Sequence, residues 1–229
     1  MLIAFDMDGT ILLGHIEGIA AGNAAAARLL VERGVPEEQA AEAVRLAYKY
    51  TTTRAGGFVT TKHEQLGLCA LLAGVAPDPA LEEAMFQAFI AGVMPHRYAD
   101  PDIRDLFPRL RQAGHRLCVQ TNSPHDVALA ELELAGILPL VDFVLTADGA
   151  GGPKGTRRYA EALAAASPFP ASEIVVVGDE ESDVVTAMIM GATSVLVDHR
   201  DSRDSLEVSP HYVINRLGEL ATVLAMITA

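Results

Sequence analysis

The first ten residues constrain this chain more than any other segment. Residues 1–5 form a short apolar run, and Asp6-Met7-Asp8-Gly9-Thr10 follows directly. A short apolar run that stops at a turn signal predicts a buried strand, and the glycine allows the chain to turn away at its end. In an open α/β sheet, ligands bind at the carboxyl ends of the strands. Because two crowded carboxylates repel each other unless a cation lies nearby, the segment predicts a metal-assisted carboxylate site.

The second half of the chain alternates apolar runs with helical patterns. From about residue 95, strands are expected at 117–120, 143–145, 174–177 and 194–197, with a short edge strand at 212–214. Helices are expected between them, at 103–113, 126–135, 157–166 and 182–190. This alternation is typical of βαβ units and predicts a mostly parallel sheet covered by helices on both faces, a Rossmann-like three-layer α/β core.

A different pattern separates the first strand from the rest of this core. The segment is rich in Ala and Leu, shows no strand alternation, and predicts helices at 16–33, 37–50, 62–73 and 80–91. We therefore expect a core made of residues 1–14 and 95–229, with a helical cap domain inserted at 15–94. The two crossings between the domains are expected at Gly14 and at 92–95.

Composition limits the partners. The 229 residues carry 17 basic and 30 acidic side chains, a formal charge of −13, which argues against nucleic acid or an anionic membrane as a partner. It leaves room for a small anionic substrate, because a metal and a few basic groups can dominate one site. The apolar stretches are too short to span a membrane, and a strand starting at residue 2 leaves no room for a secretory signal. Cys69 and Cys118 lie in apolar patterns typical of buried thiols, so we expect a cytoplasmic protein.

Two later features suit a phosphate group. Thr121-Asn122-Ser123-Pro124 follows an apolar run, and a hydroxyl followed by backbone N–H groups at a strand end suits an oxyanion. The alternative is an ordinary helix N-cap. Lys154 lies in the glycine-rich segment Gly151-Gly152-Pro153-Lys154-Gly155, from which a lysine can reach a phosphate. Its alternative is an exposed loop lysine.

A third feature suits a metal ion. Gly178-Asp179-Glu180-Glu181-Ser182-Asp183 follows the apolar run 174–177. Asp183 comes one helical turn after Asp179, so both carboxylates can face one point. Hard oxygen ligands of this kind suit Mg²⁺. Acid enrichment at a helix start explains some of these residues but not Asp179 in register with the acids of the first strand.

The order, spacing and strand contexts of these motifs resemble those of the haloacid dehalogenase (HAD) superfamily of phosphohydrolases. Within it, the chain looks like the subfamily with a helical cap after the first motif, which includes phosphoglycolate phosphatases and β-phosphoglucomutases. The resemblance implies that the first strand lies between the strands that carry Thr121 and Asp179. The chain departs from the family pattern at Gly155, where a proline is usual, and at residues 11–15, which lack the Asp-Ser pair of many phosphoglycolate-type members.

The resemblance also implies roles for the motif residues. Asp6 would be the nucleophile, and Asp8 would protonate the leaving alkoxide and then activate water. Thr121 and Lys154 would hold the phosphate oxygens. Mg²⁺ would be bound by Asp6, the backbone carbonyl of Asp8, and Asp179, with Asp183 orienting a metal-bound water.

The function expected from this set is a Mg²⁺-dependent phosphatase that hydrolyses a small phosphorylated metabolite through an aspartyl-phosphate. The alternatives are a phosphomutase of β-phosphoglucomutase type and a non-catalytic HAD-fold binding protein. Asp8 argues against the dehalogenase and phosphonatase branches, which resemble this chain but generally lack an acid there. Lys49 is the residue nearest to the cap lysine of phosphonatases, and its amphipathic context indicates a solvated side chain instead.

The cap is expected to read the leaving group. Its candidate cations are Arg45, Lys49, Arg54 and Lys62, of which Arg54, between a threonine run and a glycine pair, best suits a carboxylate or second phosphate. Asn122 is a further expected substrate-binding residue. His15 lies near the first crossing and is a candidate for substrate contact. His63 and His125 show no convincing partner in the sequence, and 124–126 is interpreted as a helix start.

Overall fold

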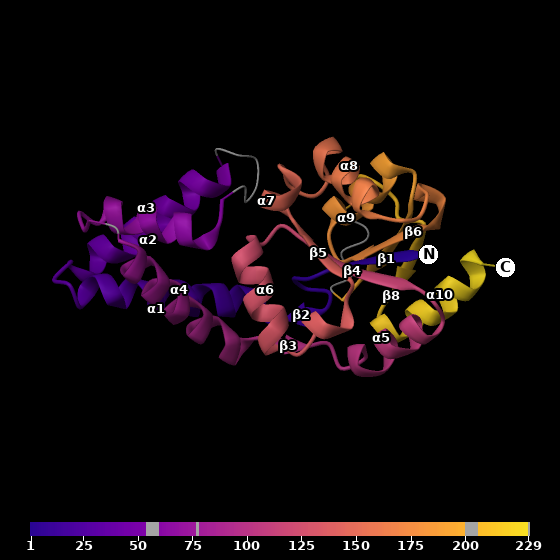
Figure 1. The fold of residues 1–229 in the computed structure, drawn as a ribbon, viewed down its shortest axis with the longest axis horizontal. Coiled ribbons are helices and arrows are strands. Elements are labelled where there is room, and N and C mark those ends of the chain that lie inside the picture. Colours follow the sequence, from indigo (N-terminus) through magenta and orange to yellow (C-terminus); the bar gives the residue numbers. More distant parts are fainter. Residues whose placement is uncertain (54–59, 77, 200–205, 229) are drawn as a thin grey trace.

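A six-stranded parallel sheet forms one end of the molecule (Figure 1). The computed structural model describes residues 1–53, 60–76, 78–199 and 206–228. The strand order is β5-β4-β1-β6-β7-β8, so β1 lies between β4 and β6, as the family resemblance implied. The strands are β1 (Leu2–Asp6), β4 (Arg116–Thr121), β5 (Phe143–Thr146), β6 (Ile174–Gly178), β7 (Thr193–Val197) and β8 (Tyr212–Ile214).

Helices cover both faces of this sheet because its strands alternate two apolar sets. Ile3 and Phe5 point to the face covered by α5 (Ile103–Gln112), α6 (His125–Leu134) and α10 (Leu220–Ile227). Leu2 and Ala4 point to the face covered by α8 (Arg157–Ala166) and α9 (Glu181–Met190). The predicted three-layer α/β architecture is therefore confirmed. The shorter helices of the described residues are α7 (Ala147–Ala150) and the 3₁₀ turns Met94–His96, Leu138–Leu140, Ala171–Glu173 and Leu217–Glu219.

Four helices form the other end of the molecule, with α6 lying between them and the sheet (Figure 1). They are α1 (His15–Val31), α2 (Glu37–Thr53), α3 (Lys62–Leu72) and α4 (Pro79–Val93), all between β1 and β4 in the chain. They share a hydrophobic cluster distinct from that of the sheet. This helical insertion was predicted, whereas the division into domains at 15–94 stays an interpretation.

The chain leaves and re-enters the sheet region through a second, small sheet that the sequence did not predict. β2 (Leu12–Leu13) pairs antiparallel with β3 (Tyr98–Ala99). Strands of two residues are too short to show an alternating pattern. The pairing holds the departing and returning segments side by side, and it brings Arg97 next to the turn that follows β1. The expected crossing at 92–95 begins inside α4, which continues through Gly92 to Val93.

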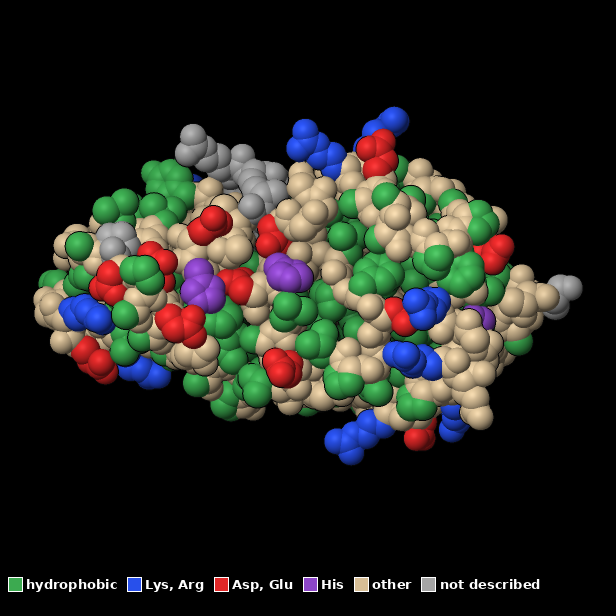
Figure 2. Space-filling view, in the orientation of Figure 1, with side chains coloured by type: hydrophobic (Ala, Val, Ile, Leu, Met, Phe, Trp, Pro, Cys, Tyr) green, Lys and Arg blue, Asp and Glu red, His purple; other side chains and the backbone are tan. Residues whose placement is uncertain are grey.

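Other predictions concern the surface and the thiols. None of the helices in the described ranges is long and apolar enough to cross a membrane. Cys69 and Cys118 are buried free thiols, as predicted. On the face shown in Figure 2, basic side chains are interspersed with acidic ones, which is the pattern of an ordinary solvated surface.

Candidate active site

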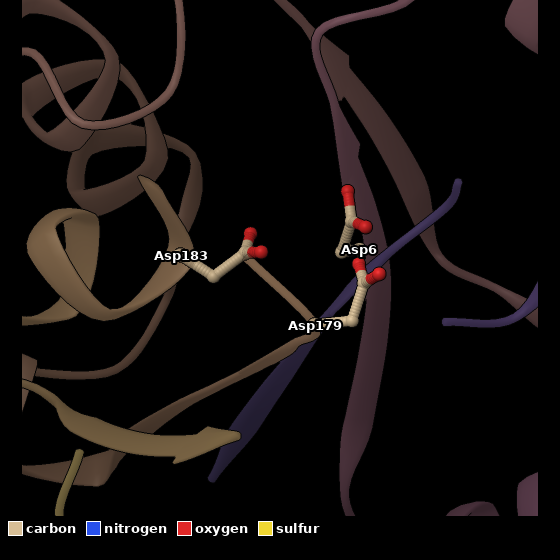
Figure 3. Close-up of side chains that lie close together, drawn as sticks. All are labelled: Asp6, Asp179 and Asp183. Atoms are coloured by element: carbon tan, nitrogen blue, oxygen red, sulfur yellow. The ribbon is translucent and has the colours of Figure 1, made fainter. Parts of the chain in front are cut away.

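Three carboxylates meet at the carboxyl edge of the sheet (Figure 3). Asp6 ends β1, Asp179 directly follows β6, and Asp183 lies in the first turn of α9. Each offers an oxygen within 4.8 Å of the others. The register explains this convergence, because Phe5 pairs with Val177 and the two strands run parallel, so their following residues emerge together. The structure thus brings together three of the carboxylates that the sequence singled out.

The turn after Asp6 is shaped by Gly9 and Thr10. Gly9 has a φ of 86°, in the left-handed region that favours glycine, and a Cβ at this position would collide with the Asp179 carboxylate. The buried Thr10 hydroxyl lies 3.3 Å from Asp6 Oδ2 and 3.4 Å from Asp179 Oδ1. Thr10 therefore links the ends of β1 and β6, a role that the sequence analysis did not assign to it.

Lys154 reaches the same cluster from a loop. Its side chain is buried, and its Nζ donates hydrogen bonds to Asp6 and, at 2.9 Å, to Asp183. The loop is fixed from two sides, because Lys154 N donates to Asn122 Oδ1 at 2.8 Å and Gly155 N donates to Thr186 Oγ1 at 2.8 Å. Of the two interpretations of Lys154, the exposed loop lysine is wrong. The expected substrate-binding residue Asn122 holds the lysine loop and also lines the cavity above it.

Thr121 completes the edge of the sheet. It is buried at the end of β4, and its Oγ1 accepts a hydrogen bond from Ser123 N at 3.0 Å. Its backbone N donates to the hydroxyl of buried Tyr159 at 2.9 Å. These bonds fix Thr121 beside Asp6 and Lys154, all three of which line one cavity. α6 begins at His125, within the helix start predicted at 124–126.

The electrostatics of the cluster show a deficit of positive charge. Burial raises the pKa of Asp6 well above its ordinary value; Lys154 opposes this shift, and the nearby carboxylates of Asp183, Asp179 and Asp8 reinforce it. Burial alone would lower the pKa of Lys154, but Asp183 and Asp6 outweigh it and raise the pKa well above the ordinary value. Lys154 therefore stays protonated, and one ammonium group faces three carboxylates.

A small hard cation fits this cluster. The Asp6, Asp179 and Asp183 oxygens are close enough to share an ion, and carboxylate oxygens are the ligands that Mg²⁺ prefers. Asp183 is also tied to the protein, since its Oδ1 accepts from Gln120 Nε2 at 2.7 Å and its Oδ2 accepts from Glu180 N at 3.2 Å. These bonds fix the Asp183 carboxylate beside those of Asp6 and Asp179.

Asp8 is turned away from this cluster. Its carboxylate forms an ion pair with Arg97, and it accepts hydrogen bonds from Ser123 Oγ at 2.8 Å and Thr121 Oγ1 at 3.4 Å. The same Arg97 guanidinium pairs with buried Glu131 of α6. The sequence analysis named neither Arg97 nor Glu131, because no local motif marks them. Their positions depend on the small sheet and on the packing of α6.

The cavity above the carboxylates has a volume of about 280 Å³ and reaches into the helical insertion. On that side it is lined by His15, Tyr48, Lys62, Gln65 and Phe89. His15 therefore lies where a substrate contact was expected. Of the candidate cap cations, Lys62 lines the cavity, Arg45 is exposed and paired with Glu42, and Lys49 is exposed. Arg54 lies outside the described residues.

One expectation about histidines was wrong. His63 Nδ1 lies 2.7 Å from Asp126 Oδ2 of α6, and its Nε2 lies 3.0 Å from Glu83 Oε2 of α4. Its ring also stacks on Phe86, with centroids 4.2 Å apart. The partners lie on other helices, so the sequence near His63 gave no sign of them.

Comparison with known proteins identifies the family. The sequence model of haloacid dehalogenase-like hydrolases matches residues 1–189, so the chain belongs to this family of hydrolases. It is 27% identical to the ribulose-1,5-bisphosphate 5-phosphatase of Halopiger xanaduensis, covering 97% of this chain and 98% of the relative. It is also 27% identical to the phosphoglycolate phosphatase of Vibrio parahaemolyticus, covering 98% and 96%.

Solved structures show the same fold. The 2-haloacid dehalogenase of Pseudomonas syringae pv. Tomato superposes with a TM-score of 0.78 at 23% identity, covering 98% of each chain. The HAD phosphatase of Thermococcus onnurineus superposes with a TM-score of 0.65 at 23% identity, covering 97% of this chain and 96% of that one. Because phosphatases and dehalogenases both share the fold, the choice between them depends on the site.

Proposed function

We propose that this protein is a Mg²⁺-dependent phosphomonoesterase that acts on a small phosphorylated metabolite. One observation carries the proposal: a second carboxylate, Asp8, lines the same cavity as the nucleophile candidate Asp6 and stands outside the metal cluster. Hydrolysis of a phosphomonoester requires a proton for the leaving alkoxide, whereas release of a halide requires none. Asp8 therefore supports phosphatase over dehalogenase chemistry. The curated relatives, which are named as phosphatases, agree with this choice.

The residues divide the reaction between them. A carboxylate oxygen of Asp6 attacks phosphorus, forming an aspartyl-phosphate as the bond to the leaving oxygen breaks. Asp8 donates a proton to that oxygen and then takes one from the water that hydrolyses the aspartyl-phosphate. Lys154 and Thr121 hold phosphate oxygens as charge spreads over them. Arg97 and Ser123 fix the orientation of Asp8 through the bonds described above.

The proposed reaction includes a Mg²⁺ ion at the carboxylate cluster. Asp6, Asp179 and the backbone carbonyl of Asp8 would hold Mg²⁺, with Asp183 behind a bound water. Its positive charge offsets the repulsion between the nucleophile and an anionic phosphate. The charge deficit of the carboxylate cluster supports this cofactor. A solved HAD hydrolase of Bacillus subtilis, YfnB, is described as bound to magnesium.

The proposal is tested with an Asp6→Asn variant. We expect it to lose hydrolysis of all phosphomonoesters, by at least about 10³-fold, because an amide cannot form the acyl phosphate. The variant should remain folded, because the change removes one negative charge from a cluster in which carboxylates already repel each other. Phosphate release from a panel of phosphomonoesters is measured with and without Mg²⁺, with halide release from 2-haloacids as the competing readout.

The products decide between the candidate activities. Free phosphate and a free alcohol support the phosphatase, and an isomeric sugar phosphate would indicate a phosphomutase. If Asp6→Asn retained wild-type phosphatase activity, the nucleophile assignment would be wrong. Halide release without phosphate release would show that the protein is a dehalogenase and not a phosphatase. If neither phosphate nor halide were released, the alternative of a non-catalytic binding protein would be favoured.

A further inference from the structure

A buried lysine stands at the cap end of the active-site cavity. Lys62, at the start of α3, is only 5% exposed. Its Nζ donates to Gln65 Oε1 at 2.6 Å and to Asn23 Oδ1 at 3.0 Å, and it lies 3.9 Å from the centroid of the Phe89 ring. All three neighbours are uncharged. Among the described residues, no carboxylate oxygen lies within the 4.0 Å of an ion pair from this nitrogen.

The nearest acidic groups are occupied elsewhere. Asp126 of α6 accepts hydrogen bonds from the backbone N of Lys62 at 3.0 Å and of His63 at 3.1 Å, and it pairs with the His63 ring. Glu131 of α6 is paired with Arg97. Burial accordingly lowers the pKa of Lys62 to about 7, and Cys69, Asp126 and Glu131 oppose this shift. A buried ammonium group without an adjacent counter-charge costs free energy, which a ligand anion would recover.

The cavity links this lysine to the chemistry. Asp6, Lys154 and Thr121 line one part of it, and Lys62, Gln65 and Phe89 line another. A phosphate bound at Asp6 and Lys154 directs its alcohol part into the remaining space, towards the helical insertion. An ammonium group has three N–H donors. Two of those on Lys62 are used by Gln65 and Asn23, the nitrogen also lies 3.9 Å from the centroid of the Phe89 ring, and the described residues supply it with no third oxygen acceptor.

We propose that Lys62, positioned by Gln65 and Asn23, binds a second anionic group on the leaving part of the substrate. The preferred substrates are therefore small phosphomonoesters whose alcohol carries a carboxylate or a second phosphate. This inference rests on the proposed function, because the phosphate at Asp6 determines where the leaving group lies. It assigns to Lys62 the role that the sequence analysis favoured for Arg54.

The test compares matched substrates in a Lys62→Met variant, which keeps the length of the side chain and removes its charge. Phosphoglycolate is paired with hydroxyethyl phosphate, and propanediol bisphosphate with propanediol monophosphate. We expect KM for the anionic member to rise by about 10- to 100-fold, the range of a lost charge-assisted hydrogen bond, with kcat/KM for the neutral member within about threefold of wild type. Lys62→Arg should restore part of the loss.

The control is Lys49→Met, which removes an exposed lysine of the insertion. Its KM should match that of the wild type for both the anionic and the neutral member of each pair. The anionic substrate for which the wild type has the higher kcat/KM, phosphoglycolate or propanediol bisphosphate, shows whether Lys62 binds a carboxylate or a second phosphate. Equal losses on the anionic and neutral members would show a structural role for Lys62 and overturn the inference, as would no loss. If the wild type hydrolysed no phosphomonoester at all, the proposed function itself would fail.

A second test uses the folded wild type. Since the pKa of Lys62 is about 7, the ammonium form that binds an anion declines above that pH. The ratio of KM for phosphoglycolate to KM for hydroxyethyl phosphate should rise by at least about fivefold between about pH 6 and pH 9. The neutral substrate corrects for titration of the phosphate and of groups at the carboxylate cluster. A constant ratio would contradict the inference even if Lys62→Met failed to fold.

Discussion

At the scale of single residues, Arg97 joins Asp8, the proposed acid and base, to Glu131 of α6. Its guanidinium is buried and pairs with both Asp8 and Glu131. Burial raises the pKa of Glu131 to about 7, with the Arg97 charge acting against this shift. Removing one partner of a buried ion pair leaves an uncompensated charge, which is more damaging than loss of an exposed pair. Arg97 therefore stabilises the protein as well as positioning Asp8.

We predict that Arg97→Met lowers the free energy of unfolding by about 3 kcal/mol, since Glu131 is left buried without its partner. The double variant Arg97→Met/Glu131→Gln should recover part of this loss. Arg45→Met, which removes an exposed pair with Glu42, should lower stability far less, because solvent screens that pair. Urea denaturation of the variants provides the measurement. A double variant as unstable as the sum of the single variants would show that Arg97 and Glu131 are not coupled.

At the scale of elements, the start of α3 is held by the opposite side of the cavity. Thr61 and Glu64 form a capping box within the insertion. Asp126 of α6 adds hydrogen bonds from the backbone N of Lys62 and His63 and from the His63 ring. A carboxylate at a helix N-terminus is also favoured by the helix dipole. The contact fixes Lys62 relative to the sheet, so one aspartate supports the geometry of the proposed substrate site.

We predict that Asp126→Ala lowers the free energy of unfolding by about 1–2 kcal/mol, the range for loss of a capping side chain. It should also raise KM for the anionic substrates, because Lys62 moves with α3. The matched control is Asp78→Ala, which removes the N-cap of α4 away from the cavity and should affect stability without changing KM. Unchanged stability in Asp126→Ala would show that Thr61 alone caps α3.

The ion pairs of His63 with Asp126 and Glu83 make the stability of the α3 contact depend on pH. Burial lowers the pKa of His63, but hydrogen bonds to Asp126 and Glu83 and their charges outweigh it and leave the pKa raised. A raised pKa in the folded state means that the stabilisation is complete below the unfolded value of about 6.5 and is lost as the pH rises through the folded value. We predict that the difference in Tm between wild type and His63→Gln is largest near pH 6 and shrinks by about pH 8.5. A difference that does not vary with pH would contradict the assignment.

At the scale of the whole molecule, the carboxylate cluster lies where β1, β6 and α9 meet, so ion binding bears on overall stability. A ligand that binds only the folded state stabilises it by about 2.7 kcal/mol at 100 times its Kd. We predict that Mg²⁺ raises the Tm of the wild type by several degrees and that Asp179→Asn abolishes the shift. Asp105→Asn, at an exposed site on α5, should retain it. Equal shifts in the two variants would show that the ion binds elsewhere.

Much of the fold and of the site was predictable. The strands of the main sheet and the longer helices were predicted near their observed ends, because apolar periodicity and turn residues act over a few positions. The convergence of Asp6, Thr121, Lys154 and Asp179 followed from the family resemblance. The pairing of β2 with β3 and the two partners of His63 were not predictable, since strands of two residues show no period and ion pairs between helices leave no local pattern.

The sequence by itself determined the chemistry available at the sheet edge. Strand ends and motif residues are set by neighbours in the chain, so Asp6, Asp8, Thr121, Lys154 and Asp179 were recognisable from short segments. Only the tertiary structure decided that Lys62 lines the cavity and what holds Asp8. Arg97 meets Asp8 across 89 positions, and Asp126 meets His63 across 63. Such contacts depend on how the insertion packs against α6, which no local pattern encodes.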